Sequence, residues 1–290
     1  MCDERTPSPH NQAAKKEQAL LDIEINLLLE GLYHLYGYDF RHYARSSIQR
    51  RLLYRMKAEG LSSITMMLDR VLHDEKAAER LLQDLSIRVT EMFRDPSFFL
   101  AFRREIIPKL RHLPQLRIWH AGCATGQEPL SMAILLHEEG LLDRTKIYAT
   151  DMNEEAIRKA QTGIYRLSSM QEYTRNYIQA GGTGEFSQYY TTTEAEARFN
   201  QELLRSILYF QHNLVTDRSF NEFHVIICRN VLIYFDEELQ SQVHRLFYDS
   251  LSTGGFLGLG SNESLFSLDK KIAYESVDST MKLYRKSGTA

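Results

Sequence analysis

Apolar residues in the first third of the chain recur at helical spacing. Between residues 20 and 85 they lie three or four positions apart, and Gly31, Gly37 and Gly60 interrupt the pattern. This spacing predicts a small all-helical bundle with turns or helix ends at the three glycines. Residues 1–18 hold Pro7 and Pro9 with little apolar content, so we expect a flexible tail there.

After Pro108 the pattern changes to short apolar runs that alternate with helical stretches. The runs predict strands at residues 116–121, 146–150, 223–228 and 256–259. Helical spacing begins at Glu128, Glu154 and Glu237. Strands that alternate with helices predict a parallel sheet with crossover helices, so the expected fold class is α/β.

The interval from residue 163 to residue 210 does not follow this rhythm. It is polar, contains glycines at positions 181, 182 and 184, and then holds two β-prone runs at 189–193 and 207–210. We interpret it as an inserted antiparallel subdomain. Near the C-terminus, 274–277 and 281–284 predict a closing hairpin. The expected organisation is therefore a tail (1–18), a helical domain (19–88) and an α/β domain (89–290) that carries the insertion.

The composition is that of an ordinary globular protein. Hydrophobic residues make up 43% and charged residues 25% of the chain, which excludes disordered, collagen-like and membrane-barrel classes. Every apolar run is shorter than the roughly 20 residues of a membrane span, and the N-terminus lacks the apolar core of a signal peptide. We therefore expect a cytoplasmic protein without membrane insertion.

Charge and cysteine content exclude further classes. The net charge of −3 provides no global attraction to nucleic acid, and no paired recognition helix or aromatic interleaving indicates one. Cys2, Cys123 and Cys228 are odd in number and lack CxxC or Cys/His spacing. We expect reduced thiols, and neither a disulfide framework nor a metal site is indicated.

A candidate ligand site lies where the strand at 116–121 turns into its helix. Gly122 and Gly126 let the backbone approach a ligand closely, at the strand end where open α/β sheets bind ligands. Asp151 ends the next strand, where nucleotide-binding sheets use an acidic side chain to bind ribose hydroxyls. Both features have alternatives: the glycines can form only a tight turn, and Asp151 with Glu154 matches a capping box.

A second candidate segment follows the strand at 223–228. It reads Cys228-Arg229-Asn230-Val231-Leu232-Ile233-Tyr234-Phe235, and its polar side chains should project into the same crevice. This segment resembles the CRNVxIYF signature of the chemotaxis receptor methyltransferases, the CheR family of S-adenosylmethionine-dependent protein-glutamate O-methyltransferases. Further blocks resemble the family in the same order, over about residues 20–286: VTEMFRD at 89–95, GCATGQEP at 122–129, ATD at 149–151 and GIY at 163–165.

The resemblance implies a Rossmann-like class I methyltransferase sheet, with S-adenosylmethionine as cofactor and S-adenosylhomocysteine as product. It implies that Arg94 contacts the cofactor and faces the transferred methyl, and that Tyr234 lies beside this methyl. Because a guanidinium and a phenol both donate hydrogen bonds to a carboxylate, we expect these two catalytic residues to orient the substrate carboxylate. The other implied cofactor-binding residues are Thr90, Gly122, Glu128 (methionyl ammonium), Asp151 (ribose), Asn213 and Leu214 (adenine), Arg229 and Asn230. Plainer interpretations exist: an ion pair of Arg94 with Asp95, a core ring for Tyr234 and a turn at Asn213.

Three positions depart from the family pattern. Gln127 replaces the first glutamate of the usual pair, Leu130 stands where a tyrosine is common, and Met92 stands where a phenylalanine is common. These changes could alter affinity, whereas Glu128 is retained. Two other functions remain open: an amide or nucleobase methyltransferase, against which the missing Asn/Asp-Pro-Pro-Tyr turn argues, and a non-catalytic S-adenosylmethionine sensor or scaffold.

Partner contacts have two candidate surfaces. Basic residues crowd the helix at 41–57, and the resemblance implies that this helix docks on receptor cytoplasmic helices; the alternative is a solvated face. Some family members also bind a receptor's C-terminal pentapeptide through a glycine-rich turn of the insertion. Here Tyr189-Tyr190 is followed by threonines, Glu194 and Glu196 without glycine, so we expect no such tether. We expect a monomer.

Overall fold

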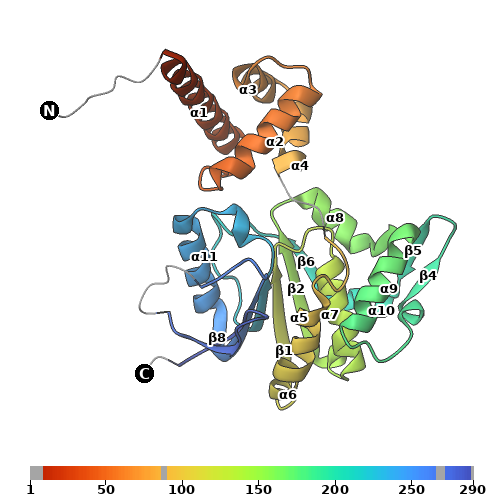
Figure 1. The fold of residues 1–290 in the computed structure, drawn as a ribbon. Helices are drawn as coiled ribbons and strands as arrows, with labels where there is room; N and C mark the ends of the chain where they lie inside the picture. The colour runs from red at the N-terminus through yellow and green to blue at the C-terminus, as the bar shows by residue number, and fades with distance from the viewer. Residues whose placement is uncertain (1–8, 86–89, 266–271, 289–290) are drawn as a thin grey trace. The chain divides into compact units, whose positions relative to one another are not determined.

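The computed structural model describes residues 9–85, 90–265 and 272–288, with side chains from residue 15 onward. The chain divides into two compact units, Met1–Ile87 and Arg88–Ala290 (Figure 1). Residues 1–8 of the expected tail, with Cys2, and Val89 of the expected motif lie outside the described residues. No described helix combines the length and the apolar character needed to cross a membrane.

The N-terminal unit is helical, as predicted. Its helices are α1 (Pro9–Tyr36), α2 (Arg45–Ala58), α3 (Ile64–His73) and α4 (Glu75–Leu85). The side chains that the apolar spacing singled out are buried together, among them Leu28, Leu32, Ile48, Leu52, Val71 and Leu81. The hydrophobic periodicity therefore identified the inner face of this unit.

Two expectations for this unit are wrong. The helix α1 begins at Pro9, so residues 9–18 are helical and not a tail. Proline suits a first helical turn, and the alanine, lysine and glutamate residues that follow are strong helix formers. Gly31 lies inside α1 and ends no helix. A Cβ atom there would lie 3.0 Å from Leu68 Cδ1, so the glycine serves the close approach of α3.

The C-terminal unit is built on a seven-stranded, mostly parallel sheet, and the α/β prediction is confirmed. The strand order is β6-β2-β1-β7-β8-β10-β9, with β10 antiparallel to both of its neighbours. The strands are β1 (Leu116–Ala121), β2 (Thr145–Asp151), β6 (Ile207–Gln211), β7 (Phe223–Cys228), β8 (Leu251–Leu259), β9 (Tyr274–Asp278) and β10 (Leu283–Lys286).

Helices pack on both faces of this sheet (Figure 1). Trp119 points toward α11, where its ring lies 5.5 Å from that of Phe247, and Ile118 points into the core on the face that α7 covers. This alternation explains why both faces of β1 are buried. The helical segments are α5 (Pro96–Ala101), η1 (Phe102–Ile106), α6 (Ile107–Leu110), α7 (Gln127–Glu138), η2 (Leu142–Arg144), α8 (Glu154–Thr162), η5 (Leu232–Tyr234) and α11 (Glu237–Ser250).

The insertion forms a small antiparallel sheet in the order β3-β5-β4, as expected. Its C-terminal boundary is different: residues 207–210 belong to β6, which pairs in parallel with β2 from Ile207↔Ile147 onward. A β-prone run fits either sheet, and only this long-range pairing decides between them. The insertion contains β3 (Ile164–Arg166), η3 (Leu167–Ser169), α9 (Met170–Gln179), η4 (Phe186–Tyr189), β4 (Tyr190–Thr192), β5 (Glu196–Phe199) and α10 (Gln201–Arg205).

One buried carboxylate anchors this insertion to the sheet domain. Glu138, at the end of α7, accepts hydrogen bonds from the Tyr177 hydroxyl and from Thr183 N (3.0 Å), both in the insertion. It also pairs with Arg103, and its side chain is only 3% exposed. Although burial acts to raise its pKa, these partners hold the pKa of Glu138 below the usual glutamate range.

Candidate active site

The loop after β1 is fixed against the end of β2. Gly122 N and Cys123 N both donate to Thr150 O at 2.8 Å, and Ala124 N donates to Asp151 Oδ2 at 2.8 Å. Gly122 and Gly126 have φ of +78° and +89°, which the missing Cβ permits. The expected glycine loop is therefore hydrogen-bonded to the carboxyl end of β2.

Asp151 does not cap a helix. The N-cap of α8 is Asn153, whose side chain accepts from Ala156 N, so the capping-box alternative for Asp151 is wrong. Instead Asp151 Oδ1 accepts from Asn153 N at 2.9 Å. Burial raises the pKa of Asp151, although the backbone N–H donors of Asn153 and Ala124 act in the opposite direction.

The turn that carries Arg94 is strained. Phe93 and Asp95, on either side of it, have φ of +52° and +53°, a region that residues other than glycine rarely adopt. Such strain persists only where the surroundings impose it. Here Phe93 N donates to Ser131 Oγ at 2.9 Å, and Asn176 Nδ2 donates to the carbonyl of Met92 at 3.1 Å. The sequence pattern missed these two supports.

Arg94 itself is half-buried. Within the described residues its guanidinium makes no hydrogen bond or ion pair, and the Asp95 carboxylate binds Arg229 Nη2 instead, at 2.7 Å. The alternative of an Arg94–Asp95 ion pair is therefore wrong. The structure fixes the backbone of Arg94 and leaves its five N–H donors available.

Arg229 is a buried residue that connects several parts of the candidate site. Its side chain is 1% exposed, so it does not line an open crevice as expected. Its Nη1 donates to Glu128 Oε2 at 2.9 Å, and its Nη2 donates to Arg94 O at 3.1 Å. The guanidinium also lies 4.2 Å from the centroid of the Phe98 ring. One cation thus connects the loop after β7, the start of α7 and the Arg94 turn.

Glu128 is the partner of this cation in the first turn of α7. Its Oε1 lies 3.1 Å from His120 Nδ1, and its other oxygen bonds Arg229. Burial acts to raise the pKa of Glu128, but His120 and Arg229 outweigh it and hold the pKa below the usual range. A carboxylate has about four acceptor positions, so Glu128 retains the capacity to accept a further donor.

The loop after β7 packs directly on the loop after β1. A Cβ atom on Gly122 would lie 2.5 Å from Val231 Cγ2, so the contact requires glycine. Asn230 has a φ of +59°, and Tyr234 ends the short helix η5 and is half-buried. Two sequence-distant loops that carry expected site residues therefore meet at the carboxyl ends of adjacent strands, β1 and β7.

The remaining expected residues lie at the edges of this cluster. Thr90 is half-buried and precedes the strained turn. His212 N donates to Asp151 O at 3.1 Å, which places Asn213 and the half-buried Leu214 beside the end of β2. Asn213 Oδ1 accepts from Val215 N at 3.0 Å, so this side chain does stabilise a local turn.

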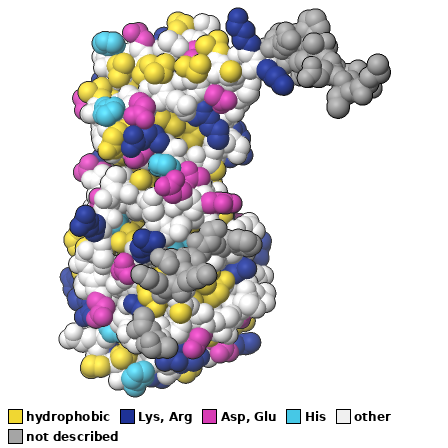
Figure 2. Space-filling model, turned by 90° about the vertical axis from the view of Figure 1, so that its left-hand side faces the viewer, with side chains coloured by type: hydrophobic (Ala, Val, Ile, Leu, Met, Phe, Trp, Pro, Cys, Tyr) yellow, Lys and Arg dark blue, Asp and Glu magenta, His cyan; other side chains and the backbone are white. Residues whose placement is uncertain are grey.

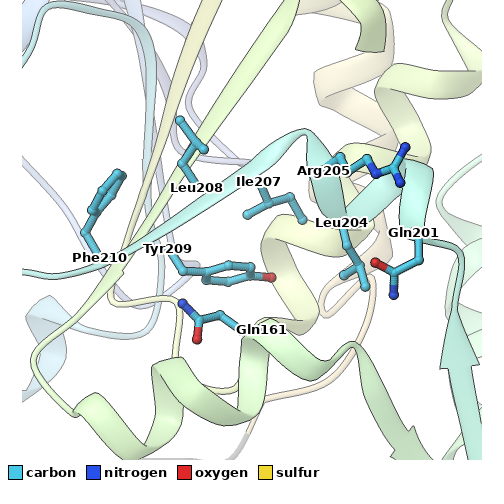
Figure 3. A pocket seen from close by; sticks show the side chains of 8 residues that line it. All are labelled: Gln161, Gln201, Leu204, Arg205, Ile207, Leu208, Tyr209 and Phe210. Atoms are coloured by element: carbon cyan, nitrogen blue, oxygen red, sulfur yellow. The ribbon is translucent and has the colours of Figure 1, made fainter.

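A surface pocket lies behind the glycine loop, between α8, α10 and β6 (Figure 3). None of the expected site residues lines it. The Tyr209 hydroxyl, which is 3.1 Å from the position that a Cβ on Gly126 would take, supports the loop from this side. The lining residues are Gln161, Gln201, Leu204, Arg205, Ile207, Leu208, Tyr209 and Phe210. We assign this pocket no function.

The packing at Gly122 predicts a large mutational effect. We expect Gly122→Ala to destabilise the α/β unit by about 1–2 kcal/mol through its left-handed backbone and by a further 1–3 kcal/mol or so through the clash with Val231. Gly140→Ala is the control, because Gly140 has a φ of +66° and a Cβ there would meet no atom within 4 Å. If denaturant unfolding gave the same loss of stability for Gly122→Ala and Gly140→Ala, the result would contradict the close contact with Val231.

Comparisons with known proteins agree with this geometry. Residues 88–282 match the CheR methyltransferase SAM-binding domain, and residues 23–86 match the CheR methyltransferase all-alpha domain. A Pseudomonas putida protein, named putative methyltransferase Cher3, is 46% identical over 92% of this chain and 97% of its own. The chemotaxis protein methyltransferases of Salmonella typhimurium and Escherichia coli are 29% and 27% identical, over 88% and 87% of this chain and 88% of theirs. The chain belongs to the CheR family of S-adenosylmethionine-dependent chemotaxis methyltransferases.

Proposed function

We propose that this protein transfers the methyl group of S-adenosylmethionine to glutamate side chains of chemoreceptor-like signalling proteins, forming methyl esters. The observation that carries the proposal is the Arg94 guanidinium. It stands on a turn held in a strained backbone conformation, and no described residue neutralises it by an ion pair. An anionic substrate side chain is the group that such a donor fits.

The side chains of the candidate site suit the cofactor. Asp151 would accept the ribose hydroxyls at the end of β2, and Glu128 would accept from the methionyl ammonium. Thr90 and Arg94 would lie at the methionyl end, Asn213 and Leu214 at the adenine, and Gly122 and Asn230 between them. Arg229 would act on the cofactor through Glu128, since its guanidinium is buried. When bound, the cofactor supplies an electrophilic methyl on a positively charged sulfur.

The reaction needs positioning more than proton transfer. A glutamate carboxylate has a reference pKa of about 4.3 and is ionised at neutral pH, so no strong general base is required. It must lose water and align with the carbon–sulfur bond. We propose that Arg94 and Tyr234 donate hydrogen bonds to this carboxylate and orient it. Neither side chain forms a covalent bond to the substrate.

The direct test is transfer from methyl-labelled S-adenosylmethionine to receptor cytoplasmic fragments. We expect base-labile label on glutamate residues, located by mass spectrometry, and no label on a fragment whose methyl-accepting glutamates are alanine. A non-catalytic sensor would bind the cofactor in calorimetry and transfer nothing. Base-stable label on asparagine or glutamine would instead indicate an amide methyltransferase.

Cofactor binding can be tested separately at Asp151. We expect Asp151→Ala to weaken S-adenosylhomocysteine binding by on the order of 1–3 kcal/mol, because ribose hydroxyls and the Ala124 N–H lose their acceptor. Asp143→Ala, at an exposed aspartate of η2, is the matched control and should bind normally. Unchanged calorimetric affinity in a folded Asp151→Ala variant would remove Asp151 from the cofactor site.

The basic helix offers fewer free charges than its sequence suggests. Arg45 pairs with Asp22 at 3.0 Å, Arg55 pairs with Asp84 at 2.6 Å, and Arg51 donates to the last carbonyls of α4. Figure 2 shows acidic side chains interspersed with the basic ones on the visible face of this unit. These arginines hold α2 to its neighbours. A docking role falls to the exposed residues of α2, which include Ser46, Arg50, Tyr54 and Lys57.

We expect the double variant Arg50→Glu/Lys57→Glu to raise KM for the receptor fragment roughly tenfold at low salt, as loss of electrostatic steering does. The effect should shrink at high salt, where charges are screened. Lys15→Glu/Lys16→Glu, at exposed positions of α1, makes the same charge change elsewhere. An equal KM rise in both variants would show that net charge, and not these residues of α2, matters.

The structure also bears on a peptide tether. The edge strand β4 is only three residues long, and Thr193 closes the following turn through bonds with Glu196. Glu194 and Glu196 are exposed there and would repel a terminal carboxylate. We propose that this protein binds no receptor pentapeptide, so calorimetric titration should show no binding. Saturable micromolar binding would overturn this.

A further inference from the structure

A further buried carboxylate binds the loop after β7, and none of the expected motifs includes it. Glu263 follows β8 and is 4% exposed. It accepts four backbone N–H groups: from Asn230 at 3.1 Å, Val231 at 2.8 Å, Leu232 at 2.8 Å and Gly260 at 2.6 Å. Three of these donors are consecutive residues of the loop after β7.

This arrangement is an anion held by backbone amides. Successive N–H groups converge on one carboxylate when the chain alternates between right- and left-handed conformations, and Asn230 supplies the left-handed residue with a φ of +59°. Burial raises the pKa of Glu263, and the N–H donors act in the opposite direction. A buried carboxylate is costly unless such donors satisfy it.

The same loop is held from its other side. Gln240, on α11, donates through Nε2 to Leu232 O and to Phe235 O, both at 3.0 Å. Glu263 binds the N–H groups at the start of the loop, and Gln240 binds carbonyls around Tyr234. A Cβ on Gly260 would lie 2.7 Å from Glu263 Oε2, so the carboxylate occupies space that only glycine leaves.

We infer that Glu263 is a positioning residue for methyl transfer: it fixes the loop at 230–234 so that Asn230 and Tyr234 present their polar groups to the reacting centre. This inference rests on the proposed function. It assigns to Glu263 no contact with substrate or cofactor. Two polar side chains, one from α11 directly after the loop and one from the segment after β8, hold a loop that has little regular structure of its own.

The test is Glu263→Gln, which keeps the shape and turns an amide NH2 toward N–H donors. Hydrogen–deuterium exchange should accelerate at least about tenfold at the amides of residues 230–232, with the amides of β1 and β7 unchanged. Turnover should fall about 100-fold, as small misplacements of reacting groups do, with KM for the receptor fragment within about twofold. The exposed Glu275→Gln on β9 is the control.

The possible outcomes separate the claims. Slow exchange at residues 230–232, or wild-type turnover, in Glu263→Gln would overturn the inference. If that variant unfolds, Glu263→Asp keeps the charge with a shorter reach and should show the same local pattern; unfolding of both would reduce Glu263 to a stability role and also overturn it. Wild-type protein that methylates no glutamate would refute the proposed function, while amide exchange would still report whether Glu263 holds the loop.

Discussion

Replacement of Arg229 by methionine should destabilise the α/β unit by about 3–5 kcal/mol, the range for breaking a buried ion pair from one side. The loss arises because Glu128 would stay buried without its ion pair to Arg229, and the Arg94 carbonyl would lose its donor. Denaturant unfolding at neutral pH measures it. The contribution of Asp95 should be small, since that side chain is 44% exposed.

The pH dependence of this loss follows from Glu128. Its pKa is depressed in the folded protein, so the ion pair stabilises the fold above the unfolded pKa of about 4.3 and ceases to do so as pH falls through the folded pKa. In Arg229→Met, only His120 would still oppose the effect of burial, so the pKa of Glu128 should be higher than in the wild-type fold. The difference in unfolding free energy between wild type and variant should therefore narrow as pH falls below about 5.

Two companion variants sharpen the result. Arg229→Lys keeps the charge but loses the planar guanidinium that reaches both Glu128 and the Arg94 turn. Its free energy of unfolding should therefore lie between those of wild type and Arg229→Met. Arg175→Met, at an exposed position of α9, should leave the free energy of unfolding almost unchanged. If Arg229→Met were as stable as Arg175→Met, the guanidinium would not be holding the site together.

The fold was predictable where burial is continuous. The structure places β1 and β7 at the same bounds as the apolar runs 116–121 and 223–228. Strands covered on both faces are apolar at most positions, so the run and the strand coincide. The run at 207–210 was assigned to the wrong sheet because its partner, β2, lies more than fifty residues earlier, and local sequence carries no record of that pairing.

The residues of the candidate site were predictable as a group, but their contacts were not. Motif resemblance indicated Arg94, Glu128, Asp151 and Arg229, and the structure brings them to the carboxyl ends of neighbouring strands. The motif resemblance could not indicate that Phe93 adopts a left-handed conformation, since a phenylalanine gives no such signal in the sequence. Glu263 was missed for a related reason: all of its partners are backbone N–H groups, which are the same at every non-proline position.

Charge patterning misled in one place. The segment at 41–57 has no acidic residue between Asp39 and Glu59, which suggested a free cationic surface. In the structure the flanking Asp39 and Glu59 pair with Arg41 and Arg55, and further acids come from other helices, Asp22 from α1 and Asp84 from α4. A cluster of basic residues in the sequence predicts a basic surface only when no acidic residue from another part of the chain pairs with it. A helical bundle brings residues that are distant in sequence together, so such pairs form here.

We expect Arg94→Ala to lower kcat by about 100- to 1,000-fold, the range for removing a donor that stabilises the reacting centre. The turn should survive, because Ser131, Asn176 and Arg229 hold its backbone and not its side chain. Circular dichroism and unfolding should therefore match wild type, and S-adenosylhomocysteine affinity should fall much less than turnover.

Tyr234→Phe provides the comparison for Arg94→Ala, because it removes one neutral donor and keeps the ring. Its loss of kcat should be smaller, since hydrogen bonds to a carboxylate from a charged donor are the stronger ones. The double variant should lose less than the product of the two single effects if both donors orient the same carboxylate. Independent, multiplicative losses would place the two side chains on different groups, and wild-type turnover in Arg94→Ala would remove the guanidinium from the reaction altogether.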